Sequence, residues 1–323
     1  MSVVYFVIPC YNEQEVLPET VKELSAKFNS MLAKNLLDES SRILFVDDGS
    51  RDQTWNLIEK YHKENPYIEG VKLAHNRGHQ FALLAGLETA ADRCDCAISL
   101  DADLQDDIEV LDEFIEKYQD GCDVVYGVRK ERKTDTFFKK TTAEGYYKIM
   151  NRLGVELVFN HADYRLMSRR ALHALSEYKE VNLFLRGVVP LIGFRSDYVY
   201  YGRKERFAGE SKYPLRKMIS FAIDGITSFS VKPMKIISSL GILISVLSVF
   251  GLLYALISYF SGNAVSGWTA TVGSIWLLGG LQMLSIGVVG GYVGKIYTES
   301  KGRPRYLIEQ FLESQPESEE NQP

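Results

Sequence analysis

The chain's densest group of potential metal-binding residues lies in the segment Ser99–Asp107. The apolar run Cys96–Leu100 ends there, and Asp101, Asp103 and Gln105 follow on alternate positions. Carboxylate and amide oxygens at this spacing suit a hard divalent cation such as Mg²⁺ or Mn²⁺. Such an ion would offset the charge that develops on a diphosphate leaving group. Two spaced acids also occur in ordinary solvated loops, and it is their place after a buried run that favours the metal site.

Three other apolar runs also end in polar residues, and these residues suit a nucleotide. An aromatic ring can stack on a base, and carboxylates and amides can hydrogen bond to base and ribose, while arginine can meet base or phosphate. The residues concerned are Tyr11, Asn12 and Glu13 after the first run, Asp47 and Asp48 after the second, and Arg77 and Gly78 after the third. Each set taken alone also fits a plain turn. His75 and His79 lack metal-ligand companions, so we expect surface or core roles for them.

The elements that must position these residues alternate along the chain. Strands are expected at 3–8, 43–46, 71–73, 96–100, 123–126 and 198–201, and helices at 17–32, 52–61, 79–91 and 110–118. Pro9 is expected to end the first strand. This alternation predicts an α/β fold, a parallel sheet with helices on both faces. Right-handed crossovers would bring the polar residues together at one edge of the sheet.

Composition narrows the class of protein. The net charge of −5 and the lack of a basic stripe argue against nucleic-acid binding. Four cysteines, Cys10, Cys94, Cys96 and Cys122, lack the spacing of a zinc site, so we expect reduced thiols in a cytosolic compartment. The apolar run near the N-terminus is too short for a signal peptide.

Two long uncharged segments, Ile236–Phe260 and Ala264–Gly294, follow the α/β region. As a helix the first would measure roughly 37 Å, enough to cross a hydrocarbon core of about 30 Å. Basic residues flank the pair on both outer sides, which predicts that both ends are cytoplasmic. Residues 213–235 mix apolar and basic side chains and are expected to form a helix in the membrane interface, with an ordinary docked helix as the alternative.

The chain is therefore expected to comprise four regions: a cytoplasmic catalytic domain at 1–212, a juxtamembrane amphipathic helix region at 213–233, two transmembrane helices within 234–296, and a cytoplasmic tail at 297–323. The acidic end of the tail is expected to be disordered. Gly287 with Gly291, and Gly290 with Gly294, form small-xxx-small pairs that would allow a homo-oligomer to pack through its membrane helices.

Taken together, several segments resemble family 2 glycosyltransferases of GT-A fold, and most specifically the polyprenyl-phosphate glycosyltransferases, which include bactoprenol glucosyltransferases and dolichyl-phosphate mannose synthases. The segments are "VIPCYNE", "FVDDGSRD", "NRGHQ", "SLDADLQD", "DYRLMSR" and "RFAGESKYPL", followed by the two uncharged segments. The resemblance extends to about Arg305. One departure is that Asp107 and Ile108 stand where such proteins commonly carry prolines, which should alter the start of the next helix more than the metal ligands.

The resemblance implies an inverting transfer of a sugar, with UDP-glucose the favoured donor, to undecaprenyl or another polyprenyl phosphate at the cytoplasmic membrane face. The product would supply lipid-linked sugar for a cell-surface glycan or glycolipid. It also implies roles for matching residues: Asp101, Asp103 and Gln105 at the metal and diphosphate, Pro9, Val46 and Arg129 at the donor besides the residues above, and Arg132, Arg206 and Lys212 at the acceptor phosphate.

Asp163 matches the position of a catalytic carboxylate in the family. A phosphate monoester has its second pKa near 6, so it is already ionised near pH 7 and needs no base. Asp163 would then orient Arg165 or the acceptor, and Asp163→Asn should be less damaging than Asp103→Asn.

Three alternatives remain open. A mannose synthase using GDP-mannose has the same motifs. A non-catalytic membrane scaffold would tolerate loss of the acids. A processive polysaccharide synthase is disfavoured, because Q-x-x-R-W is absent from the sequence.

Overall fold

The computed structural model describes residues 1–130, 161–181, 183–202, 232–261 and 267–314. The chain divides into two compact units. One comprises Met1–Tyr147, Glu156–Lys212 and Arg303–Pro323, and the other comprises Lys148–Val155 and Tyr213–Gly302. Each unit is described by itself.

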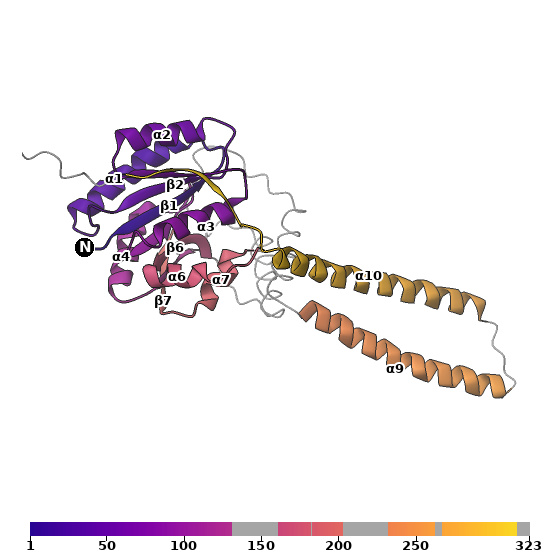
Figure 1. Cartoon of the computed structure of the whole chain (residues 1–323). Coiled ribbons are helices and arrows are strands. Elements are labelled where there is room, and N and C mark those ends of the chain that lie inside the picture. The colour runs from indigo at the N-terminus through magenta and orange to yellow at the C-terminus, as the bar shows by residue number, and fades with distance from the viewer. Residues whose placement is uncertain (131–160, 182, 203–231, 262–266, 315–323) are drawn as a thin grey trace, which may run out of the picture. The chain divides into compact units, whose positions relative to one another are not determined.

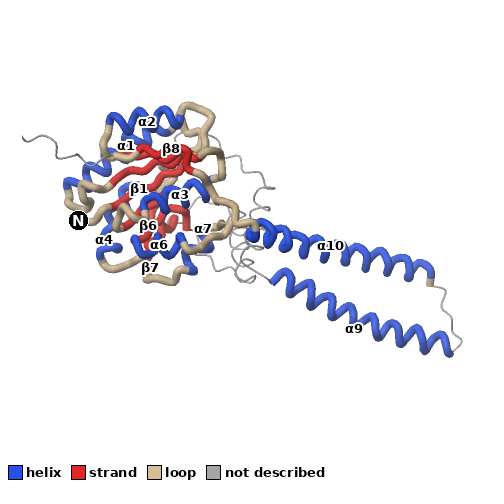
Figure 2. The backbone as a smooth tube through the Cα atoms, viewed as in Figure 1, coloured by secondary structure: helices blue, strands red, loops and turns tan. Residues whose placement is uncertain are grey.

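The first unit is built on a mixed eight-stranded sheet in the order β7-β5-β6-β4-β1-β2-β3-β8 (Figures 1 and 2). The strands are β1 Val4–Cys10, β2 Arg42–Asp47, β3 Ile68–Leu73, β4 Cys96–Ser99, β5 Val124–Arg129, β6 His161–Ser168, β7 Ser196–Tyr201 and β8 Ile308–Leu312. The helices are α1 Leu17–Ala33, α2 Thr54–Glu64, α3 His79–Ala90, α4 Leu111–Gln119, α6 Arg169–Ser176 and α7 Leu185–Leu191, with a 3₁₀ turn at Ile108–Val110 before α4.

Strand β1 lies at the centre of this unit, and all seven of its residues are buried. Its Phe6 side chain meets Phe28 of α1 edge to face, with ring centroids 5.7 Å apart. On α3, a Cβ added at Gly86 would lie 2.4 Å from a methyl group of Val7. Glycine therefore lets α3 approach β1 closely. A strand covered on both faces needs apolar residues at successive positions, which is the pattern seen in the sequence of β1.

The predicted α/β class is confirmed, and three details are corrected. Strand β1 continues through Pro9, which pairs in register with Val46, instead of ending before it. The sheet is mixed and not parallel throughout: β1 to β4 pair in parallel, but β6 pairs antiparallel with both β4 and β5. Strands β6 and β8 were not anticipated. All four cysteines are buried and free, as expected.

The segment after the second long helix returns to the first unit and pairs there as β8. It lies antiparallel to β3. Before it, Arg305 donates to the Glu88 carboxylate at 2.5 Å and to the Tyr178 carbonyl at 2.7 Å, and the Tyr306 hydroxyl donates to the second Glu88 oxygen. Glu88 on α3 therefore holds this C-terminal segment against the helix whose first residue is His79.

Replacing Glu88 with Ala is expected to lower the free energy of unfolding by roughly 1.5–3 kcal/mol, because it leaves the largely buried Arg305 guanidinium without its carboxylate. Glu309→Ala is the matched control. Its carboxylate is 52% exposed and pairs with Lys72 at 3.3 Å, so it should cost less than about 1 kcal/mol. Denaturant unfolding of the detergent-solubilised chain measures both. Equal losses in the two variants would contradict this account of β8.

The second unit contains α9 Lys232–Phe260 and α10 Trp268–Ser300, which contact each other. Their large apolar side chains are exposed, for example Phe250 at 64% and Leu277 at 73%. Within the described residues one helical segment, Leu277–Ser300, is long and apolar enough to cross a membrane. Helix α9 covers the first uncharged segment, Ile236–Phe260, and α10 covers the second from Trp268 onward. The expected interface helix within 213–233 lies outside the described residues, apart from its last two positions.

Candidate active site

The predicted convergence at one sheet edge is observed for the strand ends of the first unit. Strands β1, β2, β3 and β4 run parallel, so the loops that follow them share that edge. Strand β6 runs the other way, and it therefore brings its first residues, not its last, to this edge. In its register with β4, Ser99 pairs with Arg165. Continuing that register by two residues brings Asp101 opposite Asp163.

The loops after β1 and β2 are joined by direct hydrogen bonds. The Asn12 amide donates to the Ser50 hydroxyl at 2.9 Å, and the Arg51 amide donates to the Asn12 side chain at 2.9 Å. Asn12 has a φ of 53°, a conformation that asparagine tolerates better than most residues. A cavity lined by Asn12, Glu13 and Arg51 lies between these loops. Tyr11, the residue before Asn12, is 42% exposed, which leaves its ring accessible for stacking.

Asp47 and Asp48 are both buried, and they hold backbone amides. The two oxygens of Asp48 accept the amides of Arg77 at 2.7 Å and Gly78 at 2.8 Å. Asp47 accepts the Ser50 amide at 3.2 Å. Burial raises the pKa of both carboxyls, and these amides partly offset it. The predicted donor-binding acids therefore shape the loops after β2 and β3 from within the protein.

A glycine makes that arrangement possible. Gly49 has a φ of 66°, and an added Cβ would lie 2.7 Å from the backbone nitrogen of Asn76. No side chain fits there without moving the loop after β3. The other residues predicted to bind the donor differ in exposure. Pro9 and Val46 are buried within the paired strands, Glu13 is half-buried, and Arg77 is exposed.

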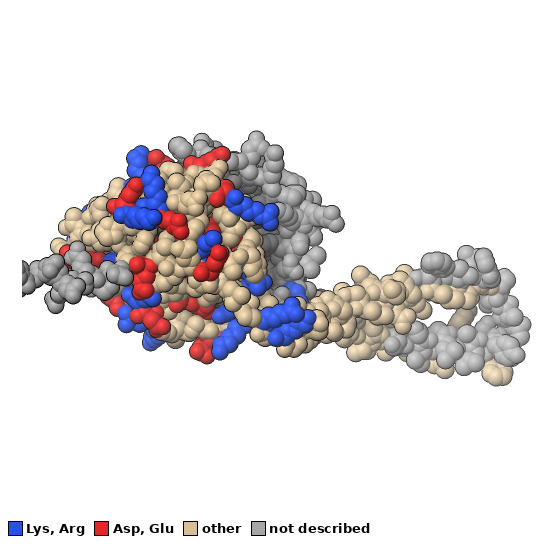
Figure 3. All heavy atoms as spheres, turned by 45° about the horizontal axis from the view of Figure 1, so that its top comes forward, with Lys and Arg blue, Asp and Glu red and all other residues tan. Residues whose placement is uncertain are grey.

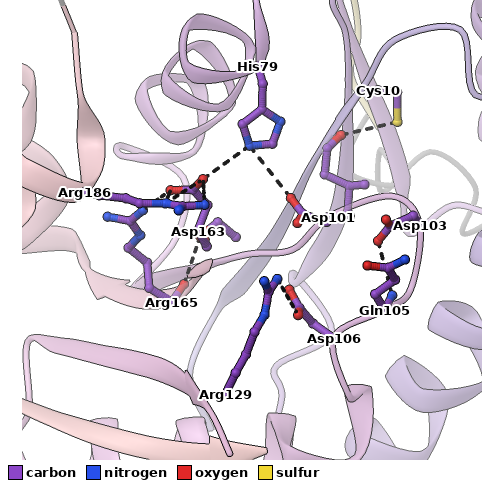
Figure 4. Close-up of polar contacts among 12 residues, drawn as sticks. Cys10, His79, Asp101, Asp103, Gln105, Asp106, Arg129, Asp163, Arg165 and Arg186 are labelled. Carbon is purple, nitrogen blue, oxygen red and sulfur yellow. Dashed lines mark hydrogen bonds and ion pairs between the residues drawn. The ribbon is translucent and has the colours of Figure 1, made fainter. Parts of the chain in front are cut away.

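Asp103 shapes the loop after β4 from within, and Asp106 ties that loop to neighbouring strands. Asp103 accepts the Gln105 amide at 3.2 Å, and Leu104 between them has a φ of 49°. Buried Asp106 accepts Arg129 at 3.1 Å and the Tyr201 hydroxyl at 2.7 Å. Arg129, predicted to meet the donor, is thus tied to the loop that carries the predicted metal ligands (Figure 4).

Asp101 lies among several negative charges. Its pKa is raised to about 6, first by burial and then by Asp106, Asp163 and Asp103, while His79 opposes the shift. A bound cation would relieve this accumulated charge, and two carboxylates with an amide fit a hard divalent ion. In the described part of the chain, no group of three or more His, Cys, Asp or Glu side chains is arranged to hold a metal. The predicted set has only two carboxylates, so it stays a prediction.

Asp163 is buried at the start of β6, and two arginines and a histidine surround it. Arg165 donates to one carboxylate oxygen at 2.5 Å, and Arg186 donates to the other at 2.9 Å. His79 Nε2 lies 3.6 Å from Asp163 and 3.7 Å from Asp101. Burial alone would raise the pKa of Asp163, but His79, Arg186 and Arg165 outweigh it and hold the pKa well below its usual range.

Sequence reasoning missed two members of this group. His79 lies between the two acids instead of on an unrelated surface, and Arg186 on α7 was not considered (Figure 4). The pattern of α7 offered a partial signal, because Leu185, Val188 and Val189 recur at helical spacing and are buried. Three predicted acceptor residues, Arg132, Arg206 and Lys212, lie outside the described residues.

Comparison with known proteins gives consistent matches. The family model "Glycosyl transferase family 2" matches residues 5–176. The chain is 53% identical to "Uncharacterized glycosyltransferase YkoT" of Bacillus subtilis, covering 95% of this chain and 91% of that protein. It is 38% identical to "Prophage bactoprenol glucosyl transferase homolog" of Escherichia coli, covering 94% and 97%. It is also 38% identical to "Bactoprenol glucosyl transferase" of Shigella phage SfV, covering 94% and 96%.

Proposed function

This chain belongs to glycosyl transferase family 2, and from that membership we propose that it moves glucose from UDP-glucose to undecaprenyl phosphate or another polyprenyl phosphate. The observation that carries the proposal is the extent of the likeness to bactoprenol glucosyl transferases. It spans 307 residues and 94% of the chain, so it reaches beyond the α/β unit into the apolar helices. A soluble acceptor would give no reason for those helices.

The loops of the α/β unit support binding of a nucleotide sugar. The exposed ring of Tyr11 would stack on the base, and Asn12 and Glu13 line the adjacent cavity. Asp101, Asp103 and Gln105 would hold Mg²⁺ or Mn²⁺, which when bound supplies the positive charge that stabilises the leaving diphosphate. Asp106 and Arg129 keep the loop that carries these ligands in place.

The acceptor chemistry agrees with the state of Asp163. Its depressed pKa makes it a poor proton acceptor near pH 7. A sugar hydroxyl would need a base, whereas a phosphate monoester is largely ionised at that pH and attacks the anomeric carbon without one. The ion pairs of Asp163 therefore support a role in positioning Arg165 and Arg186 and not in proton transfer.

The second unit supports membrane attachment. Between Ile236 and Phe260 there is no charged residue, and side chains such as Leu247 and Ile257 are exposed. Figure 3 shows charged side chains over the α/β unit, while none appears on the described part of the helices on the face shown, away from their basic ends. Contiguous apolar surface of this extent is typical of contact with lipid.

We further propose the predicted membrane arrangement. Both α9 and α10 cross the cytoplasmic membrane, both termini and the catalytic domain are cytoplasmic, and 213–233 lies in the interface next to the acceptor phosphate. Added Cβ atoms at Gly287 and Gly291 would meet nothing within 4 Å, which leaves that face of α10 open for self-association.

The assay incubates membranes holding the chain with undecaprenyl phosphate, Mg²⁺ or Mn²⁺ and a panel of nucleotide sugars, and it identifies the lipid by mass. We expect a hexosyl undecaprenyl phosphate with UDP-glucose. Product with GDP-mannose alone would favour the mannose synthase alternative. Metal-dependent binding of UDP-glucose in calorimetry, without any lipid product, would reject the proposed acceptor, and absence of both would favour the scaffold.

A further inference from the structure

Asp163 and the two arginines that hydrogen bond to it together carry more positive than negative charge. Asp101, 3.7 Å from His79, is the further acid that faces Arg186. Arg165 is 1% exposed and donates to one oxygen of Asp163, so these two form a buried neutral pair. Arg186 donates to the same carboxylate at 2.9 Å, and its side chain remains 40% exposed. Two guanidinium groups thus share one carboxylate. The surplus positive charge belongs to Arg186, the member that solvent can reach.

Arg186 is held in place by its surroundings. It is the second residue of α7, whose first residue donates its amide to the Gln80 side chain at 2.8 Å. The carbonyl of that residue, Leu185, accepts Arg165 at 3.4 Å. Arg186 also bonds to Asp163 through Nε at 3.2 Å as well as through its terminal nitrogen. Its remaining donors are therefore presented from a fixed position.

The position of Arg186 favours contact with the acceptor phosphate over contact with the donor diphosphate. Figure 4 shows Asp103 and Gln105 on one side of Asp101, and Asp163 with Arg186 on the other. In an inverting displacement the nucleophile attacks the face opposite the leaving group. With the leaving diphosphate at Asp103 and Gln105, the attacking phosphate approaches from the side of Arg186.

We infer that Arg186 binds an oxygen of the acceptor phosphate and orients it for attack on the sugar. This inference rests on the proposed function and names a contact for it that lies beyond residues 5–176, which the family model matches. In the step, one phosphate oxygen forms a bond to the anomeric carbon as the bond from that carbon to the donor diphosphate breaks, and the electron pair leaves with the diphosphate. The guanidinium transfers no proton.

The test compares Arg186→Gln, Arg186→Lys and wild type in the full chain. Steady-state transfer gives KM for undecaprenyl phosphate, and calorimetry with Mn²⁺ gives the affinity for UDP. We expect Arg186→Gln to raise the acceptor KM roughly 10- to 100-fold, the range expected for losing a charged hydrogen bond, while UDP affinity stays within about twofold. Arg170→Gln, which removes an exposed arginine paired with Asp123 outside the site, is the matched control and should match wild type in both.

Arg186→Lys keeps a positive charge beside Asp163 but loses the fork of donors, so it should raise the acceptor KM by a smaller factor. If Arg186→Gln does not fold, Arg186→Lys is the deciding variant. An acceptor KM equal to that of wild type in Arg186→Lys would then overturn the inference. An unchanged acceptor KM in Arg186→Gln would also overturn it, as would a loss of UDP affinity equal to the loss for the acceptor. If wild type itself forms no lipid-linked sugar, the proposed function fails and the inference with it; an active wild type with an unaffected glutamine variant rejects the inference alone.

Discussion

Replacing Asp103 with Asn is expected to reduce turnover by roughly 10³-fold, the scale of several kcal/mol that a metal contributes to charge stabilisation, with little change in Tm. The asparagine keeps the oxygen that accepts the Gln105 amide, so the loop retains its shape. What it removes is one of the two carboxylate charges proposed to hold the cation. Transfer assays over a Mn²⁺ titration should show a higher Mn²⁺ requirement as well as slower turnover.

Asp107→Asn provides the control within the same acidic run. Asp107 accepts the Glu109 amide at the start of the 3₁₀ turn and is outside the proposed ligand set. We expect it to keep turnover and its Mn²⁺ requirement close to those of wild type. Equal losses in the two variants would mean that general acidity of the loop, and not a ligand at position 103, supports the reaction.

Replacing Asp163 with Asn is expected to reduce stability more, and turnover less, than replacing Asp103 with Asn. Removing the carboxylate charge leaves Arg165 and Arg186 facing each other, and breaking a buried ion pair in this way costs roughly 3–5 kcal/mol of stability. Turnover should fall on the order of 10- to 100-fold, as for residues that orient reacting groups, and so by less than in Asp103→Asn. Equal loss of turnover in the two variants, with donor binding intact, would contradict this ranking.

The pH dependence separates this ion-pair effect from general damage. Because the folded-state pKa of Asp163 is depressed, its contribution to stability is fully present above its unfolded pKa of about 4 and is lost as the pH falls through the folded value. The part of the gap in unfolding free energy between wild type and Asp163→Asn that comes from the two arginines should therefore shrink below about pH 4. His79, whose pKa Asp163 helps to raise, adds to the gap below about pH 6.5 and loses that contribution as the pH rises through its folded pKa. Asp197→Asn is the control, because it breaks a partly exposed ion pair with Lys117. It should lower the free energy of unfolding by less than about 1 kcal/mol.

Much of the fold could be predicted because its signals are local. Buried parallel strands such as β1 and β2 appear as short apolar runs, and the polar residues after them mark the ligand edge of the sheet. The two uncharged segments likewise match α9 and α10. These features depend on the composition of single elements, so no knowledge of distant partners was needed.

Strands β6 and β8 depend on distant partners, which local patterns do not reveal. In β6, Tyr164 and Leu166 join the core, while Asp163 and Arg165 on the alternate positions are buried as an ion pair. Two charged residues at alternate positions hide such a strand from a hydrophobic pattern, and no element was predicted there. Residues Ile308–Leu312 form β8 because β3 offers its edge and Glu88 binds Arg305 and Tyr306 before them.

The site was predicted in the same uneven way. Asp101 and Asp103 form a compact motif, so their proximity is visible in the sequence. Arg186 and His79 come from separate elements, and they meet Asp163 only because β6 runs antiparallel to β4. The hydrogen bonds that Asp48 accepts from the backbone of the loop after β3 are equally impossible to predict from local sequence patterns.

The most direct test of the account measures both products of one reaction. The purified full chain is supplied with UDP-glucose, undecaprenyl phosphate and Mn²⁺, and the UDP released and the hexosyl lipid formed are quantified together. The account predicts equal molar amounts of the two, both abolished by chelating the metal and both strongly reduced in Asp103→Asn. UDP release without any hexosyl lipid, or lipid formation that persists without a divalent metal, would contradict it.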